Sequence, residues 1–291
     1  MASLWGANVS TDGAMEALKA DIVQRMLYKQ AETLMMFSDA VTMTPIDSLE
    51  FQVTLPDMQF MEVEEITEGA LADFQKIEWY KVQTSMKKYQ TRIRITDEAK
   101  VRNQIEIEMQ QSNAMSSKGL ARAKDIEIAG TLESGKGGTT AATKAWTSGD
   151  ASIADDIATV IGKIFDTTYI TDQDIGGLLL YYPAKLWPYL MKPTEMANIQ
   201  NSIGNWITTN YRLTLKPTRL YSNKAMLVMQ SNETALHLTY SGNQIPLSEP
   251  VRVPGVGNDY YVTQMYKTFI LPNSKDDKSH NNRVQMITGV A

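Results

Sequence analysis

The segment Gly130 to Gly137, with the sequence GTLESGKG, is the part of the chain that most nearly matches a phosphate-binding motif. It fits the G-x-x-x-x-G-K pattern of a P-loop, in which backbone amides and a lysine cradle phosphates. Gly137, however, stands where a serine or threonine hydroxyl should hold Mg²⁺, and Glu133 would place a carboxylate beside phosphates. The preceding residues are typical of a helix end, whereas a P-loop follows a strand. A nucleotide-binding soluble enzyme is therefore a weaker alternative.

Two pairs of aspartates could suggest a metal ion. Asp155 and Asp156 fall in the first turn of a predicted helix, where the helix dipole favours acids, so capping is the better interpretation. Asp172 and Asp174 lack the remaining ligands and the closing glutamate of a calcium loop. We expect no metal site at either pair.

Other chemically active residue types are scarce. Cysteine is absent, which excludes disulfides, thiolate metal sites and cysteine nucleophiles. Of the two histidines, His237 alternates with apolar residues in a predicted strand, which favours a hydrogen-bonded structural role, and His280 lies in a polar run. Sequence patterns of serine hydrolases, zinc peptidases and dinucleotide-binding enzymes do not occur. We expect a protein that is not an enzyme, with no catalytic residue and no cofactor.

Composition narrows the class further. In 291 residues, 43% apolar and 21% charged residues are ordinary for a globular protein with a sizeable core. The net charge of −5 argues against a basic domain that grips nucleic acid. The N-terminus lacks the pattern of a signal peptide, and the most apolar stretch, Ile175 to Ala184, is far shorter than the roughly 20 residues that cross a bilayer. We expect a soluble protein without a membrane partner.

The first predicted element of the chain is a helix over residues 13–38, which ends before Thr44-Pro45 because proline disfavours helical geometry in the residue before it. Residues 49–95 then alternate apolar and polar side chains at both ends, which predicts two long extended arms. Because an isolated two-stranded ribbon is only marginally stable in water, such a ribbon would be expected to lie on a neighbouring molecule. The alternative is a sheet edge made of broken strands and loops.

Charge is divided along this predicted ribbon. The outgoing part, from Glu50 to Tyr80, holds eight acids and a single base, and the return from Lys81 to Ile95 holds five bases and no acid. Opposite charges could pair within the hairpin as cross-strand neighbours. Alternatively, they could pair between adjacent chains, where complementary charge sets direction and register. Under the second hypothesis the candidate inter-subunit residues are Glu62, Glu64, Glu65, Glu68, Lys87, Lys88, Arg92 and Arg94.

A long helix follows the ribbon. Thr96 is a plausible N-cap with two acids behind it, and no proline interrupts the chain to about Leu132, although a bend is expected near residues 116–119. Residues 153–165 predict an amphipathic helix, and Leu178 to Tyr182 a buried strand. Short alternating segments follow, so the fold class is α+β.

The order of these elements, and several sequence segments within them, resemble the major capsid proteins of tailed phages, which have the Hong Kong ninety-seven type fold. The stretch YQTRIRITDEA from Tyr89 is similar to the strand that leads from that family's extended loop into its spine helix, and DIEIAG from Asp125 to the end of that helix. LLLYYPAKLW from Leu178 resembles a buried strand with its proline-started helix, and RVQMITGV from Arg283 a closing strand of the peripheral domain.

The resemblance implies a division of the chain into parts. These are an N-terminal arm over 1–48, an extended loop over 49–95, a spine helix and peripheral domain over 96–150, an axial domain over 151–250 and a return to the peripheral domain over 251–291. It also implies a structural subunit that assembles with itself into the hexamers and pentamers of an icosahedral shell around double-stranded viral DNA.

The implied location is the virion capsid, assembled in the host cytoplasm. Scaffold, portal or decoration proteins are possible partners, and the packaged DNA would be enclosed without sequence-specific contact. Alternatives that stay open are an encapsulin-type compartment shell and a tail or baseplate protein.

Overall fold

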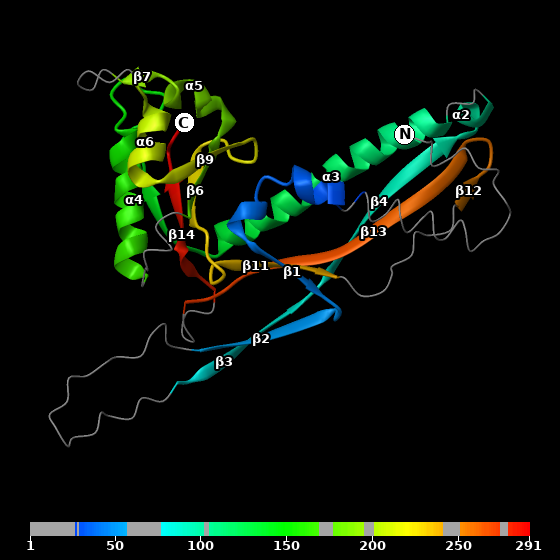
Figure 1. Cartoon of the computed structure of the whole chain (residues 1–291), viewed down its shortest axis with the longest axis horizontal. Helices are drawn as coiled ribbons and strands as arrows, with labels where there is room; N and C mark the ends of the chain where they lie inside the picture. The colour runs from blue at the N-terminus through cyan, green and yellow to red at the C-terminus, as the bar shows by residue number, and fades with distance from the viewer. Residues whose placement is uncertain are drawn as a thin grey trace.

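The computed structural model describes residues 27, 29–56, 77–101, 105–168, 177–194, 201–240, 251–273 and 279–291. Figure 1 shows a compact part at the upper left, a long helix and long strands that run from it to the right, and a two-stranded ribbon that points to the lower left. The sheets and helices confirm the predicted α+β class.

The elongated part is built on a five-stranded sheet, here the long sheet, in the order β1-β11-β13-β12, with β4 paired to the other edge of β13. Strand β13 is 14 residues long and pairs antiparallel with β4 over ten residues. The strands are β1 (Thr42–Ile46), β4 (Lys87–Thr96), β11 (Ala235–Tyr240), β12 (Val251–Val253) and β13 (Gly257–Ile270).

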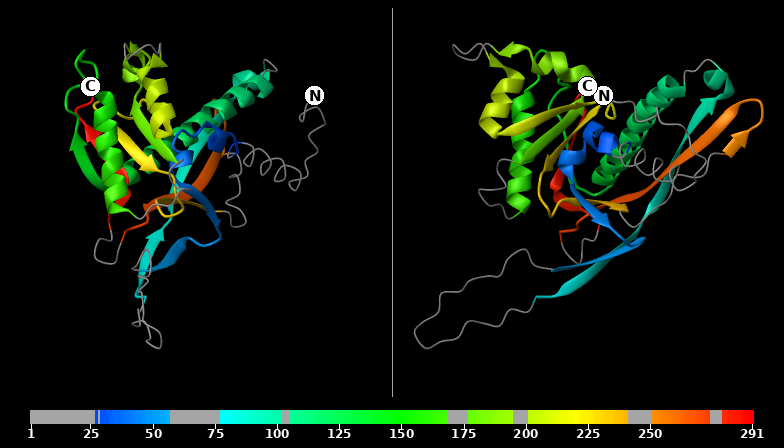
Figure 2. Two further views of the ribbon diagram at one scale, coloured as in Figure 1. Left: turned by 60° about the vertical axis from the view of Figure 1, so that its left-hand side comes forward. Right: turned by 45° about the vertical axis from the view of Figure 1, so that its right-hand side comes forward.

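The predicted spine helix is present. Helix α2 (Asp97–Val101) begins directly after β4, and α3 (Ile105–Ser134) runs for 30 residues, about 45 Å at 1.5 Å per residue. Both views in Figure 2 show α3 lying along the face of the long sheet. Thr96, predicted as the helix N-cap, is the last residue of β4.

The compact part is a second five-stranded sheet, here the compact sheet, in the order β5-β14-β10-β6-β9. All six residues of β6 are buried because both faces of the sheet are covered. Leu178, Leu180 and Tyr182 pack with α4, whereas Leu179 and Tyr181 face a second core. The strands are β5 (Lys136–Ala141), β6 (Leu178–Pro183), β9 (Leu213–Thr218), β10 (Lys224–Met229) and β14 (Asn281–Thr288).

Helices and short elements cover the first face of the compact sheet. Helix α4 lies along it, and α5 and α6 pack together at one end (Figure 1). The elements are α4 (Ile153–Thr167), the 3-10 turn η3 (Ala184–Leu186), α5 (Trp187–Leu190), β7 (Pro193–Thr194), β8 (Asn201–Ser202) and α6 (Ile203–Tyr211).

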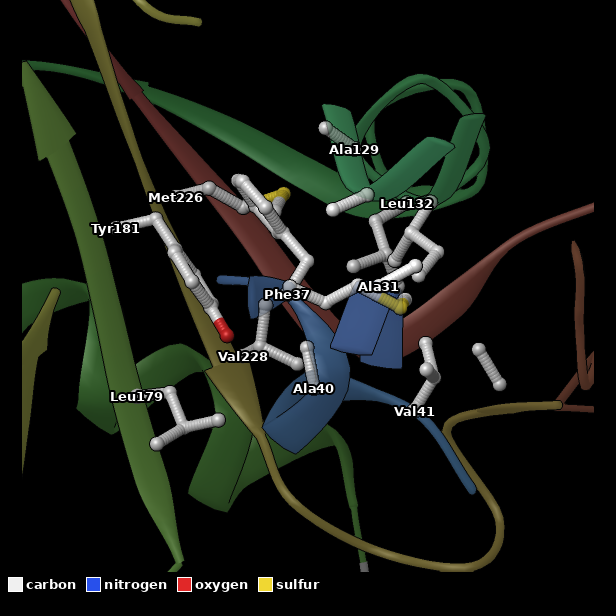
Figure 3. Close-up of a cluster of buried hydrophobic side chains, with 14 of the residues drawn as sticks. Ala31, Phe37, Ala40, Val41, Ala129, Leu132, Leu179, Tyr181, Met226 and Val228 are labelled. Carbon is white, nitrogen blue, oxygen red and sulfur yellow. The ribbon is translucent and has the colours of Figure 1, made fainter. Parts of the chain in front are cut away.

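The second core joins the two parts of the molecule. Figure 3 shows Phe37 packed beside Tyr181 and Met226, neighbours on paired strands of the compact sheet, with Ala129 and Leu132 of α3 nearby. The rings of Phe37 and Tyr181 stack with centroids 4.1 Å apart. Residues from the N-terminal segment, the spine helix and both sheets therefore share one apolar core.

The N-terminal segment is held on α3 by backbone hydrogen bonds. The amide of Met36 and that of Phe37 both donate to the Asp125 carboxylate at 3.0 Å. Burial raises the pKa of Asp125, although these two amides act in the opposite direction. Within the predicted helix, residues 29–34 are helical; the 3-10 turn η1 (Ser38–Ala40) and β1 follow. Leu34, at the end of this helical stretch, is half exposed.

The expected division of the chain into parts stays a prediction, and within two of these parts the chain crosses from one sheet to the other. Of residues 251–291, expected together in the peripheral domain, β13 lies in the long sheet and β14 in the compact sheet. Conversely β11, from the segment assigned to the axial domain, pairs with β1 and β13. Burial on both faces explains the position of β14, which lies between β5 and β10.

Candidate assembly interface

A two-stranded ribbon leaves the body of the molecule, as both views in Figure 2 show. Strands β2 (Glu50–Pro56) and β3 (Trp79–Ser85) pair antiparallel, from Glu50 opposite Ser85 to Pro56 opposite Trp79. The acidic candidates Glu62, Glu64, Glu65 and Glu68 lie between these strands, outside the described residues.

The ribbon has two unlike faces because side chains alternate across a strand. Phe51, Val53, Leu55 and Val82 are partly buried against a small apolar cluster that includes Phe269 of β13. The rings of Phe51 and Phe269 lie 5.8 Å apart. The opposite face of β2 and β3 is exposed. One face therefore anchors the ribbon to its own subunit, and the other is available to solvent or to a neighbour.

Aromatic residues mark where the ribbon leaves its anchor. The hydroxyl of Tyr80, a buried residue, donates to the carbonyl oxygen of Pro272 at 3.0 Å. The next residue outward, Trp79, leaves 60% of its surface exposed. Large exposed aromatic side chains are enriched at protein–protein contacts. Tryptophan at this point is what an interface with another molecule would use.

The structure assigns four of the five bases of the predicted return arm to a different strand. Only Lys81 lies on β3; the chain turns away at Met86, and β4 pairs with β13 instead of β2. The physical reason is burial, since Ile93 and Ile95 of β4 are 3% exposed in the long sheet. A single hairpin over 49–95 is therefore corrected to a ribbon over 50–85 followed by a strand of the long sheet.

Two of the candidate bases already have a partner in their own chain. Arg94 donates to both oxygens of Asp259 on β13, at 2.6 and 2.9 Å, and Arg92 approaches the same carboxylate at 3.6 Å. Hydrogen bonding to Arg94 lowers the pKa of Asp259. Pairing of Arg92 and Arg94 with the acids of an adjacent chain would have to compete with this contact.

Lys87 and Lys88 are in a different position. Both are exposed at the start of β4, where they pair with Tyr266 and Met265. Within the described ranges neither makes an ion pair, so their ammonium groups are open to an acidic partner. Of the four candidate bases, these two are the best placed for contact between chains.

A charged contact that sequence reasoning missed lies at the far end of the long sheet. Arg252 of β12 donates to both oxygens of Asp97 at the start of α2, at 2.5 and 2.7 Å. Beside it, Gly257 adopts φ +154°, and a side chain there would collide with the backbone of Ile95. The sequence signal was the run Pro254-Gly255-Val256-Gly257, whose glycines indicate a turn.

The P-loop match has the wrong architecture. Its first residues end α3, and Lys136 begins β5, so the order is helix, turn, strand. Lys136 donates to the carbonyl oxygen of Glu133 at 3.0 Å, and Lys224 pairs with the Glu133 carboxylate. The ammonium group of Lys136 and the carboxylate of Glu133, the two charged groups of this match, thus both bond to other groups of the fold. The described part of the chain holds no group of three or more acidic or histidine side chains that could bind a metal ion.

Among the described helices, none is both long enough and apolar enough to cross a lipid bilayer.

Comparison with known proteins identifies the class. A family model described as phage capsid protein matches residues 79–262, well over half of the chain. The search of curated proteins finds no match.

Solved structures share the fold. The capsid of a native GTA particle is 10% identical and superposes with a TM-score of 0.62 over 90% of this chain and 91% of that one. The capsid of Myoviridae phage XM1 is 11% identical, with a TM-score of 0.60 over 88% and 92%. A virus-like particle from Pyrococcus furiosus is 10% identical, with a TM-score of 0.59 over 92% and 98%.

A spine helix laid on a long sheet, a compact second sheet and a projecting ribbon together define a subunit with the tailed-phage capsid fold, as the resemblance in the sequence predicted. The chain belongs to the phage capsid protein family. It is a structural major capsid protein of the virion.

Proposed function

We propose that the chain assembles with itself into hexamers and pentamers of an icosahedral shell that encloses double-stranded DNA. The observation that carries this proposal is the ribbon, which is anchored on one face, exposed on the other and directed away from its own subunit (Figure 2). A surface of this kind contributes little to the stability of an isolated subunit. It becomes useful when a neighbouring copy covers it.

The charges provide a specific form of contact. In this proposal some of Glu62, Glu64, Glu65 and Glu68 of one copy meet Lys87 and Lys88 of the next, with Arg92 and Arg94 in secondary roles because Asp259 already engages them. Each exposed pair is worth only about 0–1 kcal/mol. Repetition of small terms around a closed shell would make the sum large.

Charge reversal tests this contact. Glu62, Glu64 and Glu65 are changed together to lysine, and particles are counted by negative-stain microscopy. We expect no closed shells, with the thermal unfolding of the free subunit changed little. Mixing with the Lys87→Glu, Lys88→Glu variant should restore shells. A matched control, Lys185→Glu with Lys192→Glu, reverses two exposed bases elsewhere and should not restore them. Normal shells from the triple reversal would exclude a contact between chains through these glutamates.

The contents of the shell separate the leading proposal from its alternative. Likeness to the Pyrococcus furiosus virus-like particle supports a compartment shell as the second candidate. Purified particles treated with nuclease should protect long double-stranded DNA if the chain encloses a genome. An enclosed protein and no protected DNA would favour the compartment.

Further partners belong to the same proposal. Assembly would take place in the host cytoplasm, with scaffold, portal or decoration proteins joining the shell. The net charge of −5 supports enclosure of DNA without a strong grip on it, and the chain would have no catalytic role.

A further inference from the structure

On the face of α3 that lies on the long sheet, two charged residues, Lys124 and Glu127, stand between the buried apolar residues Leu120 and Ile128. We name the residues that meet there the polar layer. Its members come from α3, β4, β11 and β13, which pack together. They are Tyr89, Lys124, Glu127, His237, Gln264, Tyr266 and Thr268.

Lys124 is the unusual member. It is 0% exposed, and its Nζ atom makes no hydrogen bond to any described residue. Among the described residues the nearest carboxylate oxygen belongs to Glu32 of the N-terminal segment, 4.0 Å away, and the ring centroid of Tyr266 is 5.5 Å away. Burial lowers the pKa of Lys124, with Glu32 acting against that change. An ammonium group with three donors is thus held in a site that offers it weak compensation.

His237 is its neighbour and is also fully buried. Its Nδ1 atom shares a hydrogen bond of 2.7 Å with the Thr268 hydroxyl, which confirms the structural role predicted for it. Its Nε2 atom makes no hydrogen bond within the described ranges. Burial, followed by the positive charge of Lys124, lowers the pKa of His237 to about 3. At neutral pH the imidazole is therefore uncharged.

The remaining charged and titratable groups that face this pair do not neutralise it. Glu127 accepts from the amide of Thr268 at 3.3 Å and pairs with Lys267 at 3.4 Å. Tyr89 stacks on Tyr266 at 4.0 Å. Burial raises the pKa of both tyrosines, and neighbouring Glu127 raises it further, so neither ring is ionised near neutral pH.

We infer that the polar layer is an acid-operated latch between the spine helix and the long sheet. A proton added to His237 places a second positive charge beside Lys124 in a buried layer, and α3 then separates from β11 and β13. Among its described residues the compact sheet buries polar groups but no lysine or histidine, so we expect it to keep its packing. This goes beyond the proposed shell role, and because it concerns the free subunit its test is independent of assembly.

The direction of the pH effect follows from the two lowered pKa values. A group whose pKa is lowered on folding contributes stability above its ordinary pKa, and that stability is lost as the pH falls. For His237 the window runs from about 6.5 down to about 3. The lowered pKa of Lys124 also makes stability fall as the pH falls, and for this group the loss begins at a higher pH because the ordinary pKa of lysine is higher than that of histidine. For His237 alone, the opening equilibrium at pH 5 should exceed that at pH 7.5 about 30-fold.

Hydrogen exchange on the full chain measures this opening. Exchange rates at pH 7.5 and 5.0, corrected for the intrinsic pH dependence of amide exchange, are compared for α3 and β11 and for α4 and β6. We expect α3 and β11 to lose protection about 30-fold at pH 5, and α4 and β6 to change little. Equal protection of α3 at the two pH values would overturn the inference.

The two histidines provide a matched pair of variants. His237→Gln keeps a hydrogen-bonding group for Thr268 but cannot gain a charge, so it should abolish the acid effect. His280→Gln removes the exposed histidine and should leave the effect unchanged. An acid effect of wild-type size in His237→Gln would exclude the latch, whatever happens in the control.

Two further measurements keep the test decisive if His237→Gln does not fold. Lys124→Met removes the neighbouring charge and should make the acid effect smaller. In wild-type protein labelled on the histidine rings, the NMR signal of His237 should stay unchanged from pH 7.5 to pH 5. Titration of His237 near its ordinary pKa of about 6.5 would contradict the buried pairing on which the latch depends.

Discussion

The compact sheet and the long sheet differ in what lies between each sheet and its helix. Helix α4 covers the compact sheet with Ile153, Ile157, Val160 and Ile164, which meet the apolar strand β6. Where a carboxylate is buried there, at Asp156, hydrogen bonds satisfy both of its oxygens. The contact of α4 with the sheet is therefore mainly apolar, although the buried hydroxyl of Tyr182 has no hydrogen-bond partner among the described residues.

Helix α3 meets the long sheet in a different way. It packs in the apolar core of Figure 3 through Ala129 and Leu132, and Leu120 belongs to the same core. Between these apolar residues α3 places Lys124 and Glu127 on polar and tyrosine side chains of the long sheet. Several polar atoms of this layer have no hydrogen-bond partner among the described residues. Burial of unpaired polar groups is costly, so this contact is expected to be weaker than the other. Because only the contact of α3 with the long sheet buries a lysine and a histidine among the described residues, we expect α3 to separate from its sheet more easily than α4 does.

The largest effect should come from the apolar core between α4 and the compact sheet. Leu180 is 0% exposed on β6, which has β10 on one side and β9 on the other, and Leu180→Ala should lower the free energy of unfolding by about 3–5 kcal/mol, because these flanking strands prevent collapse of the cavity. The same truncation at Leu120 of α3, which is 4% exposed, should cost less, about 2–3 kcal/mol. Denaturant unfolding of the two variants measures this. Equal losses would show that the two contacts do not differ.

An intermediate effect is expected at Asp156. Its carboxylate accepts from the amide and hydroxyl of Thr143, at 2.9 and 2.6 Å, and from the indole nitrogen of buried Trp146 at 2.9 Å. Asp156→Ala leaves these donors unpaired and should lower the free energy of unfolding by about 2–3 kcal/mol.

Its neighbour in the chain is the control for this change. Asp155 is exposed and its carboxylate bonds only to the Ser152 hydroxyl among the described residues, so Asp155→Ala should lower the free energy of unfolding by about 0.5 kcal/mol. Thermal unfolding followed by circular dichroism separates the two. A similar small loss for both would mean that Asp156 acts only as a helix-capping acid, as the sequence suggested.

Much of the fold could be predicted because its signals are local. An interval without proline, with acids at its start, marks α2 and α3; apolar periodicity marks α4; and an unbroken apolar run marks β6. The pairing of β4 could not be predicted, because its partner β13 lies about 170 residues away and alternation looks the same in a ribbon and in a sheet. Which strands belong to which sheet could not be predicted either, because this too depends on pairing between segments far apart in the sequence.

The candidate interface was predicted in part. Alternation around Phe51 predicted the outgoing strand of the ribbon, whereas the alternation taken for its return strand, from Tyr89 to Ile95, belongs to β4. The charge count drew attention to Lys87 and Lys88, whose role between chains stays a prediction. The polar layer was not predictable from the pattern of α3. Lys124 looks like any helix lysine that points to solvent, and only the approach of β11 and β13 buries it. Contacts between distant segments, not the residue types, decide which polar groups become unusual.

The smallest effect would sharpen the comparison most. Gly119 of α3 and Gly162 of α4 are both exposed helix residues, and an added methyl group at either would have no other atom within 4 Å, so alanine fits at both sites. Each change should favour its helix by about 0.5–1 kcal/mol.

If the subunit unfolds as one cooperative unit, both variants should raise the free energy of global unfolding equally. If α3 opens separately from the long sheet, Gly162→Ala should still raise global stability, whereas Gly119→Ala should raise mainly the hydrogen-exchange protection of α3 itself. We expect the second outcome at pH 5, where the polar layer is weakened, and the first at pH 7.5. Equal behaviour at both pH values would mean that the two halves of the subunit are coupled more tightly than their contacts indicate.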